Sequence, residues 1–403
     1  MFGKKYVGLD IADRTIEIAE VKTTGSKNEV VSLGRVFLEE GVVERGRIID
    51  KNKLAQALKI LFAEAKPNPI EPANIIFGLP EAEVFTHIFT TPDEKKIEDA
   101  IEQEINQSIP ALFKDLIYSY KVLNKKDNEL KIFVIACLKE VLQEWRDFFS
   151  EQGIDVEIFD TEVLASFRDI FFEPPTSPVC LVDIGSATTR VGIFDSNGLC
   201  MSYFSGHAGD LFDIVIAEKL GISAEIAQQK KKELGFLLGN EIYESLADPL
   251  TDLVKSIKQN LQFFEAQSLK KVEKIILLGG SSLMKGLAEF FGEQFALPVE
   301  VASAKSIKGE LPLEYLGAVG LALYGLEKKW QKSDPVFDMQ EIKLSNPKPN
   351  PQISLPDEEK EKDGSIMVAQ PKNHHKISVD VLIFLTLLLV AGAIAWWYFV
   401  IMR

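Results

Sequence analysis

Several hallmarks of common enzyme and metalloprotein classes are missing from this sequence. It has only three cysteines in 403 residues, Cys137, Cys180 and Cys200, and no CxxC pair. Neither a disulfide framework nor a zinc site is therefore indicated, and a reducing cytoplasm is the expected setting. None of the four histidines lies in an HExxH motif, and no GxxxxGK[ST] occurs, so zincin and P-loop chemistry are excluded.

Positive charge is also in short supply. The formal net charge is −15 and the isoelectric point is near 5.0, which argues against a nucleic-acid partner because such a surface needs a basic stripe. Residues 1–5 lead straight into a strand-like pattern without a long apolar region, so we expect no signal peptide. The length allows two to four domains.

The most informative stretch is residues 180–198, CLVDIGSATTRVGIFDSNG. An apolar strand reaches Asp183, a turn follows, and a second strand begins after it. Gly185 lets the backbone approach an anion, while Ser186 and Thr188 add hydroxyls beside free N–H groups. Asp183, at the end of the strand, suits a hydrated divalent cation. Taken alone, the stretch also fits an ordinary β-hairpin with a solvated Asp.

The same pattern occurs a second time, near the start of the chain. Residues 7–15 run into 16–21, an alternation of apolar and polar residues that predicts a strand. Sliding one copy along the other places Asp10 on Asp183 and Thr15 on Thr188. Two such units imply two similar halves that face each other and clamp a phosphate chain with its metal. The repeat therefore favours a nucleotide cleft.

A third segment fits this cleft. Residues 274–278 form a short buried-strand pattern, and a helix-like pattern covers 283–291. Gly279, Gly280 and Ser281 lie between them. A strand, a glycine turn and a helix in this order let a flat ring approach the backbone.

The paired loops around Asp10 and Asp183, together with LLGGSSLMKG, resemble the actin-like ATPase superfamily. Within it, the chain is most similar to the PilM family of type IV pilus assembly, over roughly residues 5–328. The resemblance implies an actin-like, ribonuclease H-like duplicated α/β fold with two lobes. It also implies ATP and Mg²⁺ as cofactors, with Asp10 and Asp183 at the metal, and it leaves self-association open.

The resemblance further implies a set of nucleotide-binding residues. In relatives a Glu, and a Lys three residues later, contact the nucleoside, and here Gln228 and Lys231 hold those places. For Lys230 and Lys232 a solvated helix face is the simpler interpretation. The implied set is Asp10, Asp13, Thr15, Gly185, Ser186, Thr188, Gly209, Lys231, Gly279, Gly280 and Ser281.

The segment that connects the two halves supplies the expected catalytic carboxylate. Relatives carry a carboxylate there near the attacking water, which makes Glu162, or Asp160, the candidate base beside Asp183. A helix cap is the alternative, because Asp160 and Thr161 precede an apolar helix pattern.

The first phosphate loop departs from the family. Ala12 and Asp13 stand where relatives have Gly followed by Ser or Thr. Ala12 adds a Cβ where close backbone approach is wanted, and Asp13 adds negative charge beside a polyphosphate. Nucleotide binding is then weakened, magnesium-dependent or lost. We expect a nucleotide-gated scaffold with little turnover.

An inserted subdomain is expected at residues 81–155, with a β-α-β-β-α pattern. Residues 91–94 read as a capping box with Pro92 at the first helical position, and the helix should end before Pro110. Such an insert is where family members contact partners; a larger domain with a split sheet is the alternative. The expected divisions are 1–80 with 156–177 for the first lobe and 178–330 for the second.

In the second lobe, a long helix is expected over roughly residues 249–268. A closing helix over 314–325 carries small residues that allow close packing between the halves.

The C-terminal region changes character. Residues 331–376 are rich in proline and charge, which predicts a disordered linker. Residues 381–401 carry no charge and are long enough to cross a bilayer as one helix, so 377–401 is expected to be a single-pass anchor in the inner membrane. The positive-inside rule places the main domain in the cytoplasm.

This anchor departs from the PilM family, whose members are typically soluble and recruited by the short cytoplasmic tail of PilN. The resemblance implies a PilN-like inner-membrane pilus protein as partner. Residues 341–347 resemble the docking segment of such a tail, so the C-terminal region reads as a fused partner remnant. A polymerising protein similar to FtsA, tethered to the membrane, is the alternative function.

Overall fold

The computed structural model describes residues 4–342, apart from residues 26, 93–95, 110, 127 and 172 and the side chain of residue 333. The described residues all fall within one compact unit, Met1–Pro347. The expected linker beyond residue 342 and the apolar segment 381–401 lie outside the described residues. Among the helices that are described, none combines the length and apolar character needed to span a bilayer.

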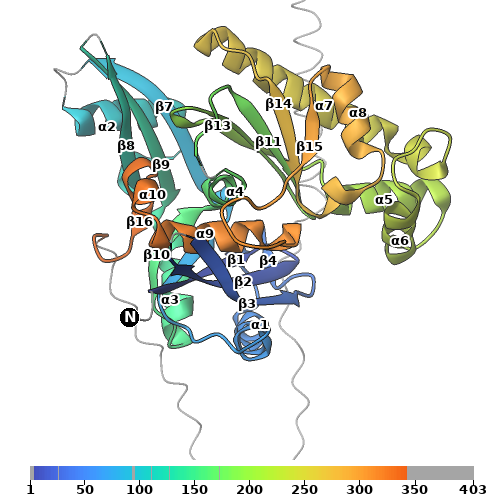
Figure 1. The fold of residues 1–403 in the computed structure, drawn as a ribbon, viewed down its shortest axis with the longest axis horizontal. Helices are drawn as coiled ribbons and strands as arrows, with labels where there is room; N and C mark the ends of the chain where they lie inside the picture. The colour runs from blue at the N-terminus through green and yellow to red at the C-terminus, as the bar shows by residue number, and fades with distance from the viewer. Residues whose placement is uncertain are drawn as a thin grey trace, which may run out of the picture. The chain divides into compact units, whose positions relative to one another are not determined.

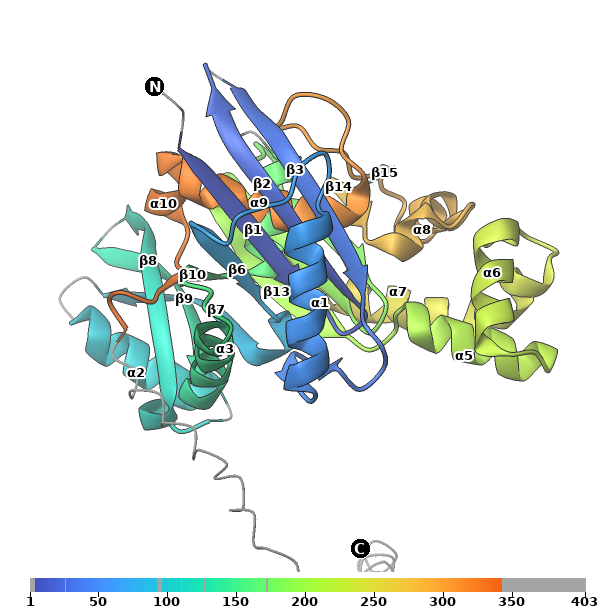
Figure 2. The same cartoon turned by 90° about the horizontal axis from the view of Figure 1, so that it is seen from below.

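The first lobe is built on a six-stranded sheet with the order β16-β10-β6-β1-β2-β3. Its central strands are buried on both faces because α1 (Lys51–Glu64) and α3 (Lys139–Glu151) cover one side and α9 (Leu316–Leu326) covers the other (Figures 1 and 2). The strands are β1 (Lys5–Ile11), β2 (Thr15–Thr24), β3 (Lys27–Phe37), β6 (Ile75–Leu79), β10 (Val156–Thr161) and β16 (Phe337–Asp338).

The second lobe repeats this arrangement. Its sheet has the order β13-β12-β11-β14-β15, in which an antiparallel meander is followed by parallel strands, as in β3-β2-β1-β6-β10. The duplication expected from the sequence is therefore confirmed at the level of strand order. The strands are β11 (Val179–Ile184), β12 (Thr189–Asp195), β13 (Gly198–Ser205), β14 (Lys274–Leu278) and β15 (Val299–Val301).

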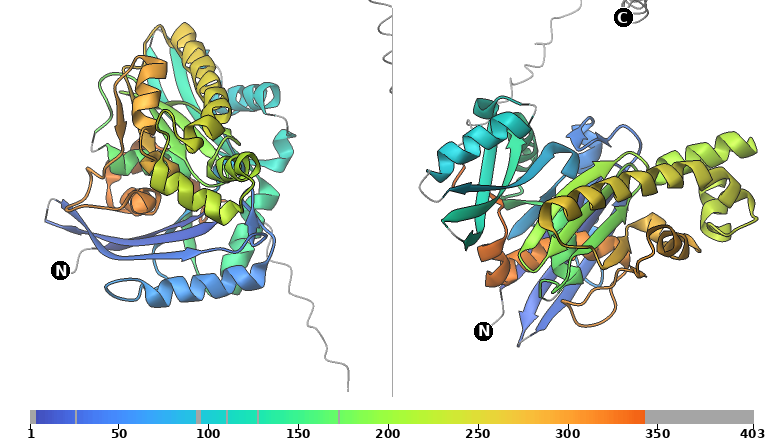
Figure 3. Two further views of the ribbon diagram at one scale, coloured as in Figure 1. Left: turned by 90° about the vertical axis from the view of Figure 1, so that its right-hand side faces the viewer. Right: turned by 90° about the horizontal axis from the view of Figure 1, so that it is seen from above.

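Helices α5 (Gly209–Leu220), α6 (Ala224–Leu234), α7 (Glu241–Ser268) and α8 (Leu287–Phe295) belong to this lobe (Figure 3). Helix α7 begins eight residues before Pro249, where the sequence predicted its start. Its buried residues Ile242, Leu246 and Leu250 continue through the proline. Burial of this stripe outweighs the one backbone hydrogen bond that a proline removes.

The inserted subdomain is a three-stranded sheet, β7-β9-β8, packed against α2 (Ile97–Ser108). Side chains of β9 alternate between two cores: Ile132, Val134 and Ala136 pack with α2, whereas Phe133, Ile135 and Cys137 belong to the first-lobe core. Helix α3 contacts β9 of the insert and also packs into the first-lobe core, where its Trp145 ring lies 4.8 Å from that of Phe77. The strands are β7 (Val84–Pro92), β8 (Leu116–Lys126) and β9 (Glu129–Leu138).

The expected capping box at residues 91–94 is wrong. Thr91 and Pro92 are the last residues of β7, paired with Leu130 and Glu129, and α2 begins only at Ile97. Burial of Thr91 within the sheet outweighs the local cap signal. The end of α2 at Ser108, before Pro110, agrees with the prediction.

Residues 331–342, assigned to the linker from composition, are part of the fold. Helix α10 (Lys328–Ser333) leads into β16, which pairs antiparallel with β10. Phe337 is fully buried, and Asp334 binds Arg168 with 2.8 Å between Oδ2 and Nε. The proline-rich composition therefore predicted a linker where a short strand occurs, and this strand is held in place by buried contacts.

Small residues let α9 cross α4 (Glu162–Ile170) at very short range. A Cβ on Gly320 would lie 1.8 Å from the carbonyl oxygen of Ala165, and one on Gly8 would lie 1.8 Å from that of Ala318. Only glycine fits at either position. The core around these helices includes Leu181 and Leu278 of the second lobe, so α4 and α9 join the halves.

Candidate functional site

The two predicted phosphate loops have matching backbone geometry. The N–H of Ala12 donates to the carbonyl of Thr15 (2.9 Å), and the N–H of Gly185 donates to that of Thr188 (3.0 Å). In each hairpin the aspartate ends up opposite a charged residue of the next strand: Asp10 faces Glu17, and Asp183 faces Arg190. The alignment predicted from the sequence is thus confirmed residue by residue.

The second loop is held against the start of α5. The N–H of Gly209 donates to the carbonyl of Gly185 (3.0 Å), and that of Asp210 donates to the carbonyl of Ser186 (2.8 Å). A Cβ on Gly209 would lie 3.2 Å from the hydroxyl of Ser281. These four predicted site residues, Gly185, Ser186, Gly209 and Ser281, therefore lie together.

Gly279 closes this group from the end of β14. Its φ of +80° places it in a backbone region that favours glycine, and a Cβ there would lie 2.4 Å from Oδ1 of Asp183. At Gly280 a Cβ would meet open space. The backbone is thus glycine-lined beside Asp183, as a site for a phosphate or a flat ring requires.

Arg190 joins the carboxylates at the centre. Its guanidinium binds Asp183 (2.6 Å, Nη2 to Oδ2) and forms an ion pair with Glu162. Glu162 also accepts the backbone N–H of Glu81 at 3.2 Å. Glu162 is thus placed with Asp183 as predicted, but its carboxylate already has a cation and a backbone donor.

Burial raises the pKa of several of these acids. It raises the pKa of Glu162 to about 8 and that of Glu81 to about 7, with Arg190 opposing both shifts. Burial likewise raises the pKa of Asp10 to about 6, while Arg190 opposes this shift and the Glu17 charge adds to it. The cause is the loss of water around charged groups.

Asp10 has room for a further contact. Its Oδ1 is buried without a hydrogen-bond partner among the described residues. Its Oδ2 would lie 2.3 Å from a Cβ on Gly317, so α9 begins directly against it. An unpaired carboxylate oxygen beside glycine-lined backbone fits a donor or a cation that arrives with a ligand.

The site residues fit the phosphate chain of ATP but do not fit Mg²⁺. The glycine-lined backbone suits a phosphate chain. The metal half does not fit, because Glu162 and Asp183 are engaged by Arg190, and in the part of the chain that the structure describes no three His, Cys, Asp or Glu side chains are arranged as a metal site.

Asp13 and Thr15 of the first loop have local partners. The Asp13 carboxylate accepts the N–H groups of Arg45 (3.0 Å) and Gly46 (3.3 Å), which fixes the hairpin of β4 (Val43–Glu44) and β5 (Arg47–Ile48). Thr15 opens β2 and pairs with Phe37. Between them, Arg14 reaches Asp210 of α5 at 3.2 Å and so links the two loops.

Lys231 is the buried member of its charge run. Its Nζ donates to the carbonyl of Gly209 (3.0 Å) and lies 2.7 Å from Oδ1 of Asp213. Burial lowers the pKa of Lys231, which the Asp213 carboxylate opposes. Lys230 and Lys232 bind Glu241 and Gln228 on the surface, as the solvated-face interpretation predicted.

Asp160 lies apart from this centre. It forms a buried ion pair with Arg168, whose Nη2 lies 3.2 Å from Oδ1. The helix-cap interpretation is confirmed for its neighbour Thr161, whose hydroxyl accepts the N–H of Leu164. The sequence patterns did not predict Arg190 as a site residue; the available signal was an arginine at the start of the strand that follows the second phosphate loop.

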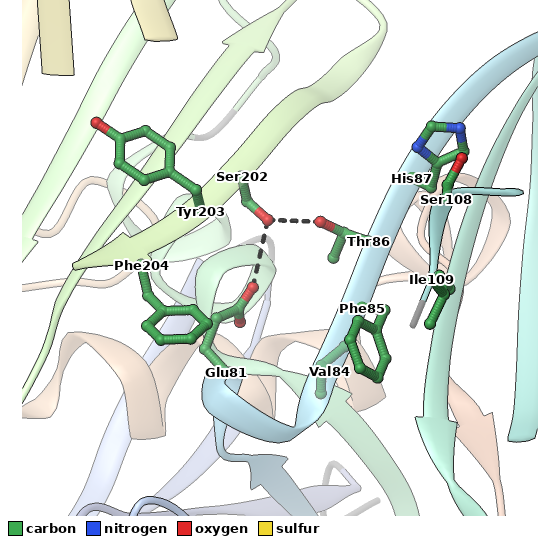
Figure 4. A pocket seen from close by; sticks show the side chains of 10 residues that line it. All are labelled: Glu81, Val84, Phe85, Thr86, His87, Ser108, Ile109, Ser202, Tyr203 and Phe204. Carbon is green, nitrogen blue, oxygen red and sulfur yellow. Dashed lines mark hydrogen bonds between the residues drawn. The ribbon is translucent and has the colours of Figure 1, made fainter. Parts of the chain in front are cut away.

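A second groove, which shares Glu81 with the carboxylate centre, runs between the insert and the second lobe, where β7 and β13 are edge strands of their sheets (Figure 4). It encloses a volume of about 240 Å³. The hydroxyls of Thr86 and Ser202 are hydrogen-bonded across it at 2.6 Å, and Phe204 lies on its wall with 53% of its surface exposed. We call this feature the β7–β13 groove.

Comparison with known proteins agrees with this architecture. The cell division protein FtsA of Pseudomonas aeruginosa is 24% identical over 81% of this chain and 90% of its own. A structure described as the PilM-PilN type IV pilus biogenesis complex matches with a TM-score of 0.69 at 21% identity, covering 80% of this chain and 98% of that one. The ethanolamine utilization protein EutJ of Carboxydothermus hydrogenoformans matches with a TM-score of 0.52 at 16% identity, covering 81% and 91%.

These structural matches show an actin-like fold, which agrees with the prediction. A family profile adds what fold similarity does not give. The profile described as type IV pilus assembly protein PilM matches residues 8–323, which include both phosphate loops, the insert and most of the closing helix. This chain therefore belongs to the PilM family of type IV pilus assembly proteins.

Proposed function

We propose that this protein is a membrane-anchored, nucleotide-binding scaffold of the inner-membrane platform that assembles a type IV pilus, or of a related type II secretion machine. The observation that carries the proposal is the match of the PilM family to residues 8–323. The scaffold binds the cytoplasmic tail of a PilN-like partner on one surface and ATP between its phosphate loops, with little or no hydrolysis.

The nucleotide part of the proposal is supported by the glycine-lined backbone of Gly185, Gly209 and Gly279 beside Asp183. Calorimetric titration of ATP into the full-length chain tests it. Asp183→Ala should weaken binding, because it removes the carboxylate that holds Arg190 beside the glycine-lined backbone, whereas Asp252→Ala, an exposed aspartate on α7, should leave it intact. Equal binding by Asp183→Ala would refute the assigned site. A robust steady-state ATPase rate that Asp183→Ala abolishes would refute the proposal of little turnover.

The β7–β13 groove is the surface that we assign to the PilN-like tail. Both of its walls are sheet edges, and an extended peptide can add to a free strand edge through its main chain while its side chains fill the groove. The similarity in fold to a chain of a structure described as the PilM-PilN type IV pilus biogenesis complex supports a tail of this kind as the occupant.

A pair of matched phenylalanines tests this assignment. Phe204 lies on the groove and is 53% exposed, and Phe263 lies on α7 and is 56% exposed. Phe204→Glu should weaken binding of a synthetic PilN tail peptide by at least about tenfold, since it places a charge where apolar contact is needed. Phe263→Glu should not. Equal affinities for the two variants would place the partner elsewhere.

The membrane anchor rests on sequence alone, since residues 381–401 lie outside the described part. The proposal is supported by the absence of charge over that stretch. Fractionation of cells that express the full chain or residues 1–347, the compact unit, tests it. The full chain should remain with the membrane after an alkaline carbonate wash and the shorter one should not. Release of both by the wash would refute the anchor.

The FtsA-like alternative has one observation in its favour, the 24% identity to a cell division protein over most of the chain. It predicts nucleotide-dependent filaments. Electron microscopy and pelleting with and without ATP would reveal them; a monomer or small complex that retains a PilN-like protein favours the pilus scaffold.

A further inference from the structure

We propose that Arg190 is the resident cation of the phosphate site: it occupies the position between Glu162 and Asp183 that a divalent cation would otherwise take, so ligand binding does not depend on metal. The inference concerns the carboxylate cluster itself. Its extension to ATP rests on the proposed function.

The geometry begins with the hairpin. Four residues separate the paired positions Ile184 and Thr189, so Arg190 falls directly opposite Asp183. Opposite residues of an antiparallel pair share one face of the sheet, and their side chains are within reach of each other. The 2.6 Å contact between Nη2 and Oδ2 of Asp183 follows from this register. Arg190 therefore belongs to the same hairpin as Asp183 and does not come from a distant segment.

The second partner fixes the other half of the guanidinium. Glu162, the first residue of α4, pairs with Nη1, so the two terminal nitrogens hold two carboxylates from different elements. The guanidinium is planar and permanently charged, and its fork of donors matches carboxylate and phosphate oxygens. Arg190 and these two partners together form what we call the arginine bridge.

The side chains around the arginine bridge are acidic, so a cation is needed to balance their negative charge. Asp10 and Glu81 are also buried there and electrostatically coupled to Arg190. The neighbouring basic side chains are used elsewhere, since Arg14 binds Asp210 and Lys231 binds Asp213. A magnesium ion requires free oxygens in near-octahedral geometry. The bridge has already engaged two of those oxygens.

Arg190 remains able to meet a ligand. Its side chain keeps 18% of its surface exposed, against 6% for Glu162. Arginine binds phosphate by the same bidentate geometry that it uses with carboxylates. A phosphate on the glycine-lined backbone would then be neutralised by a guanidinium that the protein carries permanently.

Manganese alone is the first probe, because it reports on the cluster without any nucleotide. Free Mn²⁺, followed by electron paramagnetic resonance, should not be taken up at the cluster by the full-length wild-type chain. Arg190→Met removes the charge but keeps an unbranched stem, and it should bind Mn²⁺ at least about tenfold more tightly. Arg190→Lys keeps the charge and should behave as the wild type.

Two results would overturn the proposal. The first is wild-type uptake of Mn²⁺ at the cluster, identified by its loss in Asp183→Asn. The second is a folded Arg190→Met chain that binds Mn²⁺ no better than the wild type. The wild-type measurement decides by itself if Arg190→Met does not fold in EDTA. In that case, recovery of its cooperative melting transition on addition of Mn²⁺ would support the proposal.

ATP is the second probe. Wild-type affinity measured by calorimetry in EDTA and in Mg²⁺ should agree within about threefold, whereas the affinity of Arg190→Met should become Mg²⁺-dependent by at least about tenfold. A wild-type affinity that falls more than about tenfold in EDTA overturns the inference. Failure of the wild type to bind ATP in either buffer refutes the nucleotide part of the proposed function, and the Mn²⁺ result then decides the role of Arg190.

Discussion

The β1–β2 and β11–β12 hairpins are two copies of one unit, but the residues that face their aspartates carry opposite charges. Both place an aspartate at the end of the first strand and close their turns with the same backbone bond. In the first copy the residue opposite is Glu17, whose carboxylate needs Arg35 (2.6 Å) for its own neutralisation. In the second it is Arg190. Backbone geometry was kept in both copies while the charge opposite the aspartate changed sign.

The difference predicts which of the two hairpins is better suited to hold an anion. The side chains of the first turn bind neighbouring segments of the protein. Asp13 accepts hydrogen bonds from a neighbouring hairpin, and Arg14 forms an ion pair with Asp210 of the other lobe. The second turn keeps its glycine, its hydroxyls and a positive charge beside them. We therefore expect the second copy to be the better phosphate-binding half and the first to contribute the buried carboxylate of Asp10.

Replacing the opposed residues should show the largest contrast. Arg190→Met leaves buried carboxylates without their cation and should lower the free energy of unfolding by about 3–5 kcal/mol. Glu17→Gln at the equivalent position should cost less than about 1.5 kcal/mol, because Arg35 is partly exposed and can turn to water. Urea denaturation of both full-length variants at pH 7 measures the contrast. Equal losses would mean that the two positions are not electrostatically distinct.

The first copy should also carry a pH dependence. Burial raises the pKa of Glu17 to about 7, with Arg35 opposing the shift. The native state then holds this proton more tightly than the unfolded chain, so the stabilisation is complete below about pH 4.5 and is lost as the pH rises through 7. The loss attributable to Glu17 is at most about 3 kcal/mol. Denaturation between pH 4.5 and 8 should show a shallower decline for Glu17→Gln, and parallel curves would contradict the assignment.

The turns themselves should differ by a smaller amount. Asp13→Ala removes the acceptor of two backbone N–H groups and should cost about 1–2 kcal/mol. Ser186→Ala, at the matching position, keeps the carbonyl that Asp210 uses and should change stability by less than about 0.5 kcal/mol. Thermal melting of the two variants side by side measures this, and a larger loss for Ser186→Ala would reverse the comparison.

The smallest effect is expected at the link between the copies. Arg14 and Asp210 are each about one-third exposed, so Arg14→Gln should cost only about 0.2–1 kcal/mol. Because surface charges are screened by salt, the difference from wild type should shrink in 1 M NaCl, where the Debye length is about 3 Å. A loss that persists in high salt would indicate that Arg14 acts through packing instead.

The sequence carried the duplicated fold because alternating strands and Asp-containing turns are local signals. It did not disclose the arginine bridge directly, although the hairpin symmetry that aligned Asp10 with Asp183 also sets Arg190 opposite Asp183. The contact with Glu162 depends on how α4 meets that hairpin, which no local pattern encodes.

Other differences have the same origin in tertiary contacts. The cap signal at Thr91 yielded to cross-strand pairing with Leu130. The proline-rich composition after residue 330 concealed β16, whose place is set by pairing with β10 and by burial of Phe337. In both cases pairing with a strand that is distant in the sequence outweighed the local preference of the segment.

Strand β9 has a consequence for attempts to transplant the inserted subdomain. Since its odd-numbered residues 133, 135 and 137 complete the lobe while the even-numbered 132, 134 and 136 complete the insert, the two regions share one strand as a common wall. Slippage by a single residue would exchange the two sets. The insert is therefore expected to melt together with its lobe, and a chimaera that exchanges it between relatives must carry a matching lobe surface with it.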